Sequence, residues 1–497
     1  MNRQGISARR SLFTAIALLA LLPATTWADS KDDDRLPPVR PPDGEKIRPQ
    51  KPDRELKQII KEIDHRNIET YIRTLADFGT RHTESSQTDP TEGIGAATKY
   101  VFNTLQGFAA ASGGRMTVEL QTYHQAPVPG AIITPTGVDI TNVVATLKGT
   151  VTPERIYVVS GHIDSRRTVL TDARAPQPAA DDDASGVAVI MELARVFSRH
   201  QTESTIVLTA VAGEEEGLFG SNNQATLYKA AGADIQGMFS NDIVGASKAE
   251  NGVRDPHRVR LFTEGVPTTL TPTFTPPAGA TLTEAQRLAL RSLVLVGGEN
   301  DSQSRQLGRF VKNVGQNEDT DMTVWVIYRR DRYLRASDHV SYQTQGYPAA
   351  RLTEPNETFA HEHQDTRVEN GVQFGDLVDF VDFEYVERVA RVNACAFWSL
   401  ANGPGTPKGV LIHAPVLTND TRLSWTANTD PDLQGYEVVW RMTDEEDWTN
   451  AIPVGNVTNV VLPLSPKDNF QFGVRAVDRD GHHSPVAFPQ VTTAVLP

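Results

Sequence analysis

The sequence predicts an α/β domain with a mostly parallel or mixed sheet and helices on both faces, followed by a small all-β sandwich at the C-terminus. Two observations support this fold class. Between about residues 55 and 400, short β-type runs alternate with helical patterns, and some runs are apolar throughout, as in strands buried on both faces. Beyond Gly403, alternating strands separated by turn residues replace the helical patterns, which is typical of a β-sandwich.

The first 28 residues have the features of a secretory signal peptide. Arg3, Arg9 and Arg10 form a basic start, an apolar stretch follows, and residues 26–28 offer a cleavage site. The apolar stretch is too short to span a bilayer comfortably, and no later segment resembles a transmembrane helix. We therefore expect an exported protein, periplasmic or extracellular. The pair Arg9-Arg10 leaves open whether export is of the Sec or the twin-arginine type.

The next segment, residues 29–54, is rich in proline and charge and has little to bury. This composition predicts an extended linker. The α/β domain is then expected at 55–402 and the β-sandwich at 403–497.

Within the α/β domain the elements are expected in the following order. Apolar residues at three- and four-residue steps predict helix from Glu55 to about Leu75. The segment 264–320 interrupts the alternation with proline-rich and polar sequence and is interpreted as an insertion. The later helices are expected at about 94–110, 186–198 and 377–400, and the strands at about 116–123, 142–147, 155–159 and 205–211.

Charge and cysteine content exclude some functions. The formal net charge is −14, which disfavours nucleic acid and anionic membranes as partners. Cys395 is the only cysteine, so the chain has no intramolecular disulfide, and its apolar neighbours predict a core position.

Imidazole or carboxylate groups follow four of the expected strands. His162 follows RIYVVSG, Glu214-Glu215-Glu216 follow TIVLTAVAG, Asp242 follows IQGMFSN, and His361 lies beyond AARLTEPN. Reactive groups collect at the carboxyl ends of strands in an open α/β sheet, because loops from several strands converge there. The sequence therefore predicts one site at this edge.

The run Asp181-Asp182-Asp183 places three like charges side by side before an apolar helix. The run is either a surface cluster that caps the helix, or a cation offsets the crowding. Two histidines with several carboxylates and no thiolate suit zinc or a related divalent metal. Two ions close together need a bridging carboxylate, which this run can supply.

The ordered series GHIDS, ADDDASG, AGEEEGLFGS, ND, SDH and AHEHQDT resembles the M28 family of co-catalytic zinc exopeptidases, which includes bacterial leucyl aminopeptidases. The resemblance covers about residues 55–402. It implies two Zn²⁺ per chain, with Asp182 as the bridge and Glu214 as the general base. It further implies that Asp164 orients one histidine. The implied metal ligands are His162, Asp182, Glu215, Asp242 and His361.

Some assignments stay open at this stage. A shift of one residue would make Glu215 the base and Glu216 the ligand, although the following GLFGS favours the first register. His363 is the alternative to His361, which the spacing to Asp365-Thr366 favours.

The segment DRYLRASDH offers further candidate residues. Ser337-Asp338-His339 is interpreted as support for the site or as a structural cap. Upstream of it, Tyr333 and Arg335 are candidates to contact the substrate carbonyl.

The C-terminal segment resembles a fibronectin type III domain through Trp425, Tyr436 and the strand FQFGVRAVD. His482 and His483 are expected in an exposed loop. Its expected role is spacing, substrate docking, or contact with a surface or polymer.

These observations predict an exported zinc-dependent exopeptidase acting on peptides or proteins, first of all an aminopeptidase. A carboxypeptidase or dipeptidase is the alternative, and a single-zinc glutaminyl cyclase-like transferase fits less well because five ligands are present. A silent binding protein on the same fold has no reason to keep these ligands and the base. A serine hydrolase is disfavoured, since the chain has no G-x-S-x-G motif.

Overall fold

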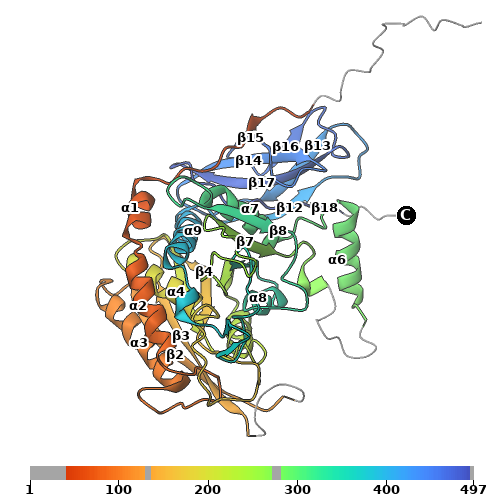
Figure 1. The fold of residues 1–497 in the computed structure, drawn as a ribbon. Helices are drawn as coiled ribbons and strands as arrows, with labels where there is room; N and C mark the ends of the chain where they lie inside the picture. The colour runs from red at the N-terminus through yellow and green to blue at the C-terminus, as the bar shows by residue number, and fades with distance from the viewer. Residues whose placement is uncertain (1–40, 129–135, 271–280, 493–497) are drawn as a thin grey trace, which may run out of the picture. The chain divides into compact units, whose positions relative to one another are not determined.

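The computed structural model describes residues 41–128, 136–270 and 281–492 (Figure 1). The chain divides into a unit Met1–Pro41 and a unit Pro42–Pro497, and the description below concerns the second. The expected signal peptide, residues 1–28, and the first part of the expected linker lie outside the described residues. No helix in the described ranges combines the length and apolarity needed to cross a membrane.

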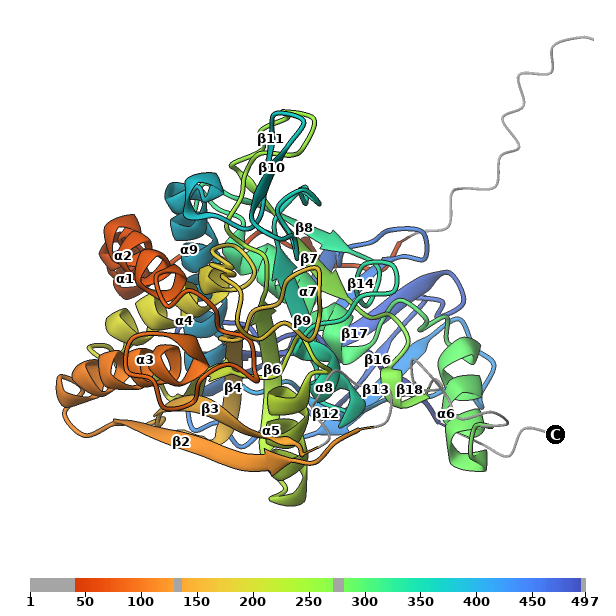
Figure 2. The same cartoon turned by 60° about the horizontal axis from the view of Figure 1, so that its bottom comes forward.

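An eight-stranded mixed sheet forms the centre of the α/β part, in the order β2-β3-β5-β4-β6-β9-β7-β8. β5, β4, β6 and β9 run parallel to one another, whereas β3 is antiparallel to β5 and β7 to β9. Figure 2 shows the long strand β2 at one edge. The predicted fold class is confirmed. The strands are β2 Met116–Gln125, β3 Val138–Leu147, β4 Thr152–His162, β5 Ser204–Val211, β6 Asp234–Asn241, β7 Arg258–Thr263, β8 Thr323–Ile327 and β9 Ala349–Thr353.

Helices cover both faces of this sheet because neighbouring residues of each central strand point to opposite sides. In β4, Tyr157 and Val159 pack into the core formed with α1, α2, α3, α4, α7 and α9. Val158 packs on the other side with Tyr342 of α8 and Ala225 of α5. The helices are α1 Arg54–Glu62, α2 His65–Ala76, α3 Gly93–Ala110, α4 Ala184–Phe197, α5 Phe219–Ala230, α6 Glu284–Leu295, α7 Gln303–Gly315, α8 His339–Thr344 and α9 Phe383–Asn402, with 3-10 turns at Thr268–Leu270 and Val378–Phe380.

Two glycines let α4 lie very close to the sheet. A Cβ atom at Gly186 would lie 2.1 Å from the carbonyl oxygen of Asn241, at the end of β6. A Cβ atom at Gly161, near the end of β4, would lie 2.5 Å from the carbonyl carbon of Gly186. Any larger side chain would push the helix away from the strand ends. The glycines of GHIDS and DASG thus set the distance between α4 and the strands that carry the site.

The interpretation of 264–320 as an insertion is wrong for its second half. Leu307, Phe310, Val311 and Val314 of α7 belong to the main core. α7 joins β7 to β8, which are parallel neighbours, so the connection must cross over the sheet. In contrast, no residue of α6 is buried, and Figure 1 shows this helix at the right, apart from the other helices.

The C-terminal strands form two four-stranded sheets, in the orders β1-β15-β14-β17 and β16-β13-β12-β18, around their own apolar core. Trp448 of this part donates from Nε1 to Gln306 Oε1 of α7 at 2.7 Å, and Arg441 Nη2 lies 2.7 Å from Asp301 Oδ2. The strands are β12 Lys408–Ile412, β13 Thr421–Thr426, β14 Leu433–Met442, β15 Asn450–Gly455, β16 Asn459–Leu462, β17 Phe470–Asp478 and β18 Gln490–Val491.

Two expectations about exposed segments are corrected. Part of the predicted linker is a strand, β1 (Glu45–Lys46), which pairs antiparallel with β15. Trp440 Nε1 also donates to the Asp43 carbonyl at 2.9 Å, so backbone pairing holds this segment where side-chain burial cannot. His482 is partly buried rather than exposed, because its Nδ1 lies 2.9 Å from Asp478 Oδ2 and its Nε2 3.6 Å from Asp53 Oδ2.

Candidate metal centre

Four neighbouring parallel strands deliver the side chains of the candidate site. β4 ends at His162, β6 ends one residue before Asp242, and Glu214-Glu215 follow β5. The turn that follows β9 supplies a second histidine, His363. Since β5, β4, β6 and β9 lie side by side, their carboxyl ends bring these residues together.

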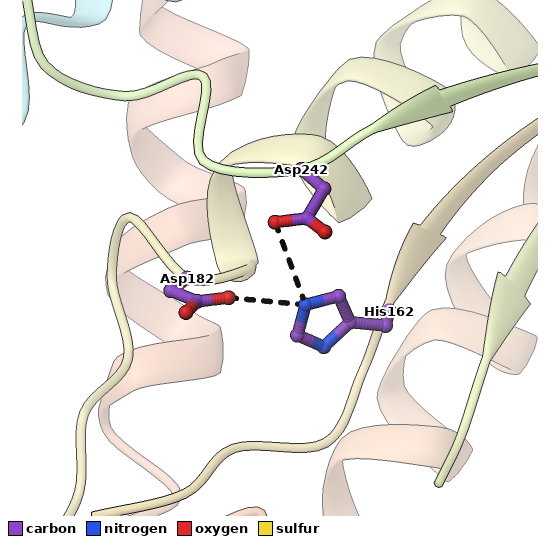
Figure 3. Close-up of side chains that lie close together, drawn as sticks. All are labelled: His162, Asp182 and Asp242. Atoms are coloured by element: carbon purple, nitrogen blue, oxygen red, sulfur yellow. Dashed lines mark ion pairs between the residues drawn. The ribbon is translucent and has the colours of Figure 1, made fainter. Parts of the chain in front are cut away.

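The first group consists of His162, Asp182 and Asp242, all buried. Figure 3 shows both carboxylates directed at the imidazole of His162. His162 Nε2 lies 3.0 Å from Asp182 Oδ1 and 3.9 Å from Asp242 Oδ1. These are atoms of the ligand types that bind zinc.

The second group consists of Asp182, Glu215 and His363. His363 Nε2 lies 2.8 Å from Asp182 Oδ2 and 3.1 Å from Glu215 Oε1. Asp182 therefore directs one carboxylate oxygen to each group, and in each group the ligand atoms lie within 4.8 Å of one another. This is the arrangement needed for a carboxylate that bridges two ions.

The structure places His363, and not the expected His361, in the second group. The ring of His361 stacks on Phe380 instead, with 3.6 Å between ring centroids and 9° between planes. His363 has a left-handed backbone (φ 55°), which turns its side chain back toward Asp182. The spacing argument failed because a left-handed residue in a turn breaks the simple relation between position in the sequence and direction of the side chain.

A hydrogen bond from His162 Nδ1 to Asp164 orients the ring of His162. His162 Nδ1 lies 3.1 Å from the Asp164 carbonyl oxygen and 3.7 Å from its Oδ1. A proton on Nδ1 satisfies this contact and leaves the Nε2 lone pair facing Asp182 and Asp242. Asp164 is itself fixed, since its Oδ2 accepts the backbone N–H of Glu215 at 3.0 Å.

The carboxylates of the two ligand groups place several negative charges close together, and added positive charge would stabilise them. Burial lowers the pKa of His363, but Glu215 and Asp182 outweigh it and raise that pKa to about 9. Burial is likewise outweighed at His162, where the hydrogen bonds to Asp164 and Asp182 raise the pKa well above its usual range. Glu215 Oε1 is buried, and among the described residues it has the ion pair with His363 but no hydrogen bond. Divalent ions can supply the charge that these protons carry here, so the donor set fits two metals.

The three adjacent aspartates have three different environments. Asp182 belongs to both groups. Asp183 caps α4: its carboxylate accepts the backbone N–H groups of Gly186 and His162, both at 2.9 Å. Asp181 points inward and accepts the Gly245 N–H at 2.6 Å. Burial and the nearby Asp376 carboxylate raise the pKa of Asp181 to about 8.

The glutamate triplet is divided in a similar way. Glu215 belongs to the second group, whereas Glu216 is buried and accepts from Thr83 Oγ1 at 2.5 Å. Glu214 belongs to neither group, and burial raises the pKa of its carboxyl group well above the usual range, with Asp242 and Glu215 adding to the effect. Glu214 therefore lies next in sequence to a candidate ligand without belonging to either ligand group.

Some supporting residues gave no recognisable signal in the sequence. Asp376 Oδ2 accepts the backbone N–H of Asp182 at 2.7 Å, and Arg351 Nη2 lies 2.8 Å from Asp242 Oδ1. Arg351 also lies 3.3 Å from Asp331. These residues are distant in sequence from the aspartates they hold, so only the folded chain brings them together.

The segment before α8 supports the site from a distance. Asp338 Oδ2 accepts from Ser160 Oγ of β4 at 3.2 Å and makes no capping bond to α8. The side chain of Tyr333 is 80% exposed and its hydroxyl is 2.8 Å from Arg329 Nη2. Arg335 pairs with Glu362, the residue before His363.

The two ligand groups, each made of carboxylates and one imidazole, share Asp182 and lie at the carboxyl edge of the mixed sheet. Together they define a candidate two-metal centre. A model of peptidase family M28 matches residues 142–276 of this chain. A protein of Pyrenophora tritici-repentis described as a probable zinc metalloprotease is 46% identical over 90% of this chain and 89% of its own length. A protein of Pyricularia oryzae with the same description is 47% identical over 91% of this chain and 88% of its own length.

The chain belongs to peptidase family M28. Among solved structures, an aminopeptidase from Aneurinibacillus sp. strain AM-1 is similar to it, with a TM-score of 0.46 and 16% identity over 70% of this chain and 96% of that one.

Proposed function

We propose that this chain is an exported, two-zinc exopeptidase, and first of all an aminopeptidase. One observation carries the proposal: Asp182 places one oxygen in each of two ligand groups, at 3.0 Å from His162 Nε2 and 2.8 Å from His363 Nε2. The names of the relatives, which describe probable zinc metalloproteases, support zinc as the metal and peptide bonds as the target.

His162, Asp182 and Asp242 would hold one zinc ion, and Asp182, Glu215 and His363 the other. When bound, such a pair of ions acidifies water and polarises the scissile carbonyl. Glu214 then accepts the proton of the attacking water on its carboxylate and returns it to the leaving amine. Asp164 and Asp376 keep His162 and Asp182 in place for this chemistry.

The alternative is a carboxypeptidase or dipeptidase with the same centre. Two guanidinium groups near the centre support this alternative, because they could bind a substrate carboxylate. Arg166 lies 3.6 Å from Glu215, and Arg335 pairs with the residue before His363. A silent binding protein is less well supported, because five candidate ligands and Glu214 are all in place around the shared aspartate.

The test is hydrolysis of three matched peptides, one with both ends free, one N-acetylated and one C-amidated, with and without a chelator. We expect the free and amidated peptides to be cleaved, the acetylated peptide to resist, and the chelator to abolish activity. Cleavage that survives N-acetylation but not C-amidation would establish a carboxypeptidase. Activity in a chelator-treated, zinc-free sample would refute a zinc enzyme.

The remaining proposals concern the ends of the chain. Export rests on the signal-like residues 1–28, and N-terminal sequencing of the secreted protein tests it. We further propose that the C-terminal sandwich has the fibronectin type III fold and contacts a surface or polymer. A variant without residues 403–497 that keeps peptidase activity but binds insoluble material less would support that role.

A further inference from the structure

Arg166 lies at the second ligand group with most of its hydrogen-bonding capacity unused. It follows β4 by four residues, and its Nε lies 3.6 Å from Glu215 Oε2. That Nε is buried and has no hydrogen-bond partner among the described residues. The side chain as a whole is nevertheless 29% exposed, so part of it is accessible to solvent.

The other arginines at the site differ from Arg166 in this respect. Arg167, the next residue, lies 2.8 Å from Asp365 Oδ1 and 3.0 Å from Asp172 Oδ2. Arg351 is fully buried between Asp242 and Asp331. A guanidinium has five N–H donors arranged to bind a carboxylate with two parallel bonds. Arg167 and Arg351 each pair with two carboxylates, although the Nε of Arg351 is also without a hydrogen-bond partner. Among the described residues, Arg166 has only the 3.6 Å ion pair with Glu215.

A second guanidinium, from the segment between β8 and α8, lies beside the turn that carries His363. Arg335 is 31% exposed and pairs with Glu362, directly before His363. Glu362 also lies 3.6 Å from Arg332, so one carboxylate serves two arginines. Burial lowers the pKa of Arg335, and the charge of Asp182 acts in the opposite direction.

The charge balance then favours an anion beside these arginines. Glu215 is the only ion-pair partner of Arg166 among the described residues, and a metal ion in the second group would also draw on that charge. The guanidinium is then left with surplus positive charge in a partly buried place, where Coulomb interactions are stronger than in water. A substrate ammonium would be repelled there, and a carboxylate attracted.

We propose that Arg166, assisted by Arg335, binds a carboxylate of the substrate next to the scissile bond. The carboxylate is either the free terminus of the leaving residue or its acidic side chain. The inference rests on the proposed function, since it requires a peptide at the metal groups. It deepens that function by giving the enzyme a preference for dipeptides or for an acidic residue after the cleaved bond.

Three peptides separate the two sources of the carboxylate: alanyl-leucine, alanyl-leucinamide and alanyl-glutamate α-amide. We expect the zinc-loaded wild type to have a kcat/KM at least 10-fold higher for one or both acidic peptides than for alanyl-leucinamide. A preference for alanyl-leucine assigns the site to a free terminus, and one for the glutamate peptide assigns it to a side chain. Equal values for all three peptides would overturn the inference.

Variants of Arg166 separate recognition from an effect on the metal ligand Glu215. In Arg166→Met we expect the ratio of kcat/KM for the preferred acidic peptide to kcat/KM for alanyl-leucinamide to fall at least 10-fold, mainly through a higher KM for the acidic peptide. Arg166→Lys should lie in between, because it keeps the charge but not the planar fork. Arg291→Met, on the exposed face of α6, is the matched control. An equal loss on all peptides would show that Arg166 acts through Glu215, and would overturn the inference.

Calorimetry provides a readout that needs no turnover. Leucine should bind the zinc-loaded protein at least 10-fold more tightly than leucinamide, and Arg166→Met should remove that difference. If this pattern holds but no peptide is hydrolysed, the carboxylate site stands and the proposed function fails. If peptides are hydrolysed without any preference for a carboxylate, the function stands and the inference fails.

Discussion

Asp376 holds the backbone of Asp182, the aspartate shared by the two ligand groups, in place. Its Oδ2 accepts the N–H of Asp182 at 2.7 Å, and its Oδ1 accepts the N–H of Asp181 at 2.8 Å. The contact joins the loop before α4 to the segment before α9, almost two hundred residues later in the chain. The position of Asp182 therefore depends on a residue outside both ligand groups.

We expect Asp376→Ala to lose zinc and to destabilise the fold. Each buried N–H left without an acceptor costs about 1–3 kcal/mol, so unfolding should become easier by about 2 kcal/mol or more. Asp376→Asn keeps an acceptor oxygen and should retain more of both properties. Denaturant unfolding and zinc content per chain measure the effects. Full zinc content in the alanine variant would show that Asp182 does not need this support.

Replacing His361 and His363 one at a time tests which of them is a metal ligand. His363→Ala should reduce the zinc content from two ions per chain to one, because it removes the only imidazole of the second group. His361→Ala is the matched control and should keep both ions, since its ring stacks on Phe380. Elemental analysis after dialysis decides between them. Loss of zinc in the His361 variant alone would restore the ligand expected from the sequence.

Replacing the base should separate binding of metal from turnover. In Glu214→Gln we expect both zinc ions to remain and kcat to fall at least 100-fold, the usual scale for loss of a general base. Glu216→Gln is the control, because Glu216 contacts Thr83 rather than the ligand groups. Steady-state kinetics on one good peptide suffice. Near-normal turnover of the Glu214 variant would assign proton transfer to another group.

The C-terminal sandwich should contribute a pH-dependent term to stability. Hydrogen bonds to Asp478 and Asp53 raise the pKa of His482 from 6.5 to about 10, although burial opposes them. A raised pKa stabilises the folded state fully below pH 6.5, and this contribution is lost as the pH rises through 10. The difference in unfolding midpoint between the wild type and His482→Gln should therefore shrink between pH 6 and pH 10.

His413→Gln is the matched control for that experiment. His413 lies in the same sandwich, and burial lowers its pKa. It therefore loses its proton at a lower pH than His482, and the difference in unfolding midpoint should not narrow between pH 7 and 10. A constant gap between the wild type and the His482 variant across the whole range would contradict the proposed ion pairs.

The sequence predicted the sheet with its covering helices because strand and helix periodicities are local properties. It also led to His162, Asp182, Glu215 and Asp242, which the structure brings together, because strand ends are recognisable from a local pattern. It favoured His361 and kept His363 only as the alternative, since the left-handed backbone at His363 depends on the surrounding turn. Asp376 and Arg351 could not be found, because nothing local marks a side chain whose partner is distant in sequence.

The pairing of β1 with β15 has a consequence for the order of folding. Residues 45 and 46 are made early, but their partners at 450 and 451 are made some four hundred residues later. Contacts this far apart in sequence form slowly, because a long loop must close first. One sheet of the sandwich therefore becomes complete only after nearly all of the chain has been synthesised. A chain that stops at the end of the α/β part leaves β1 as an unpaired strand, open to pairing with other molecules.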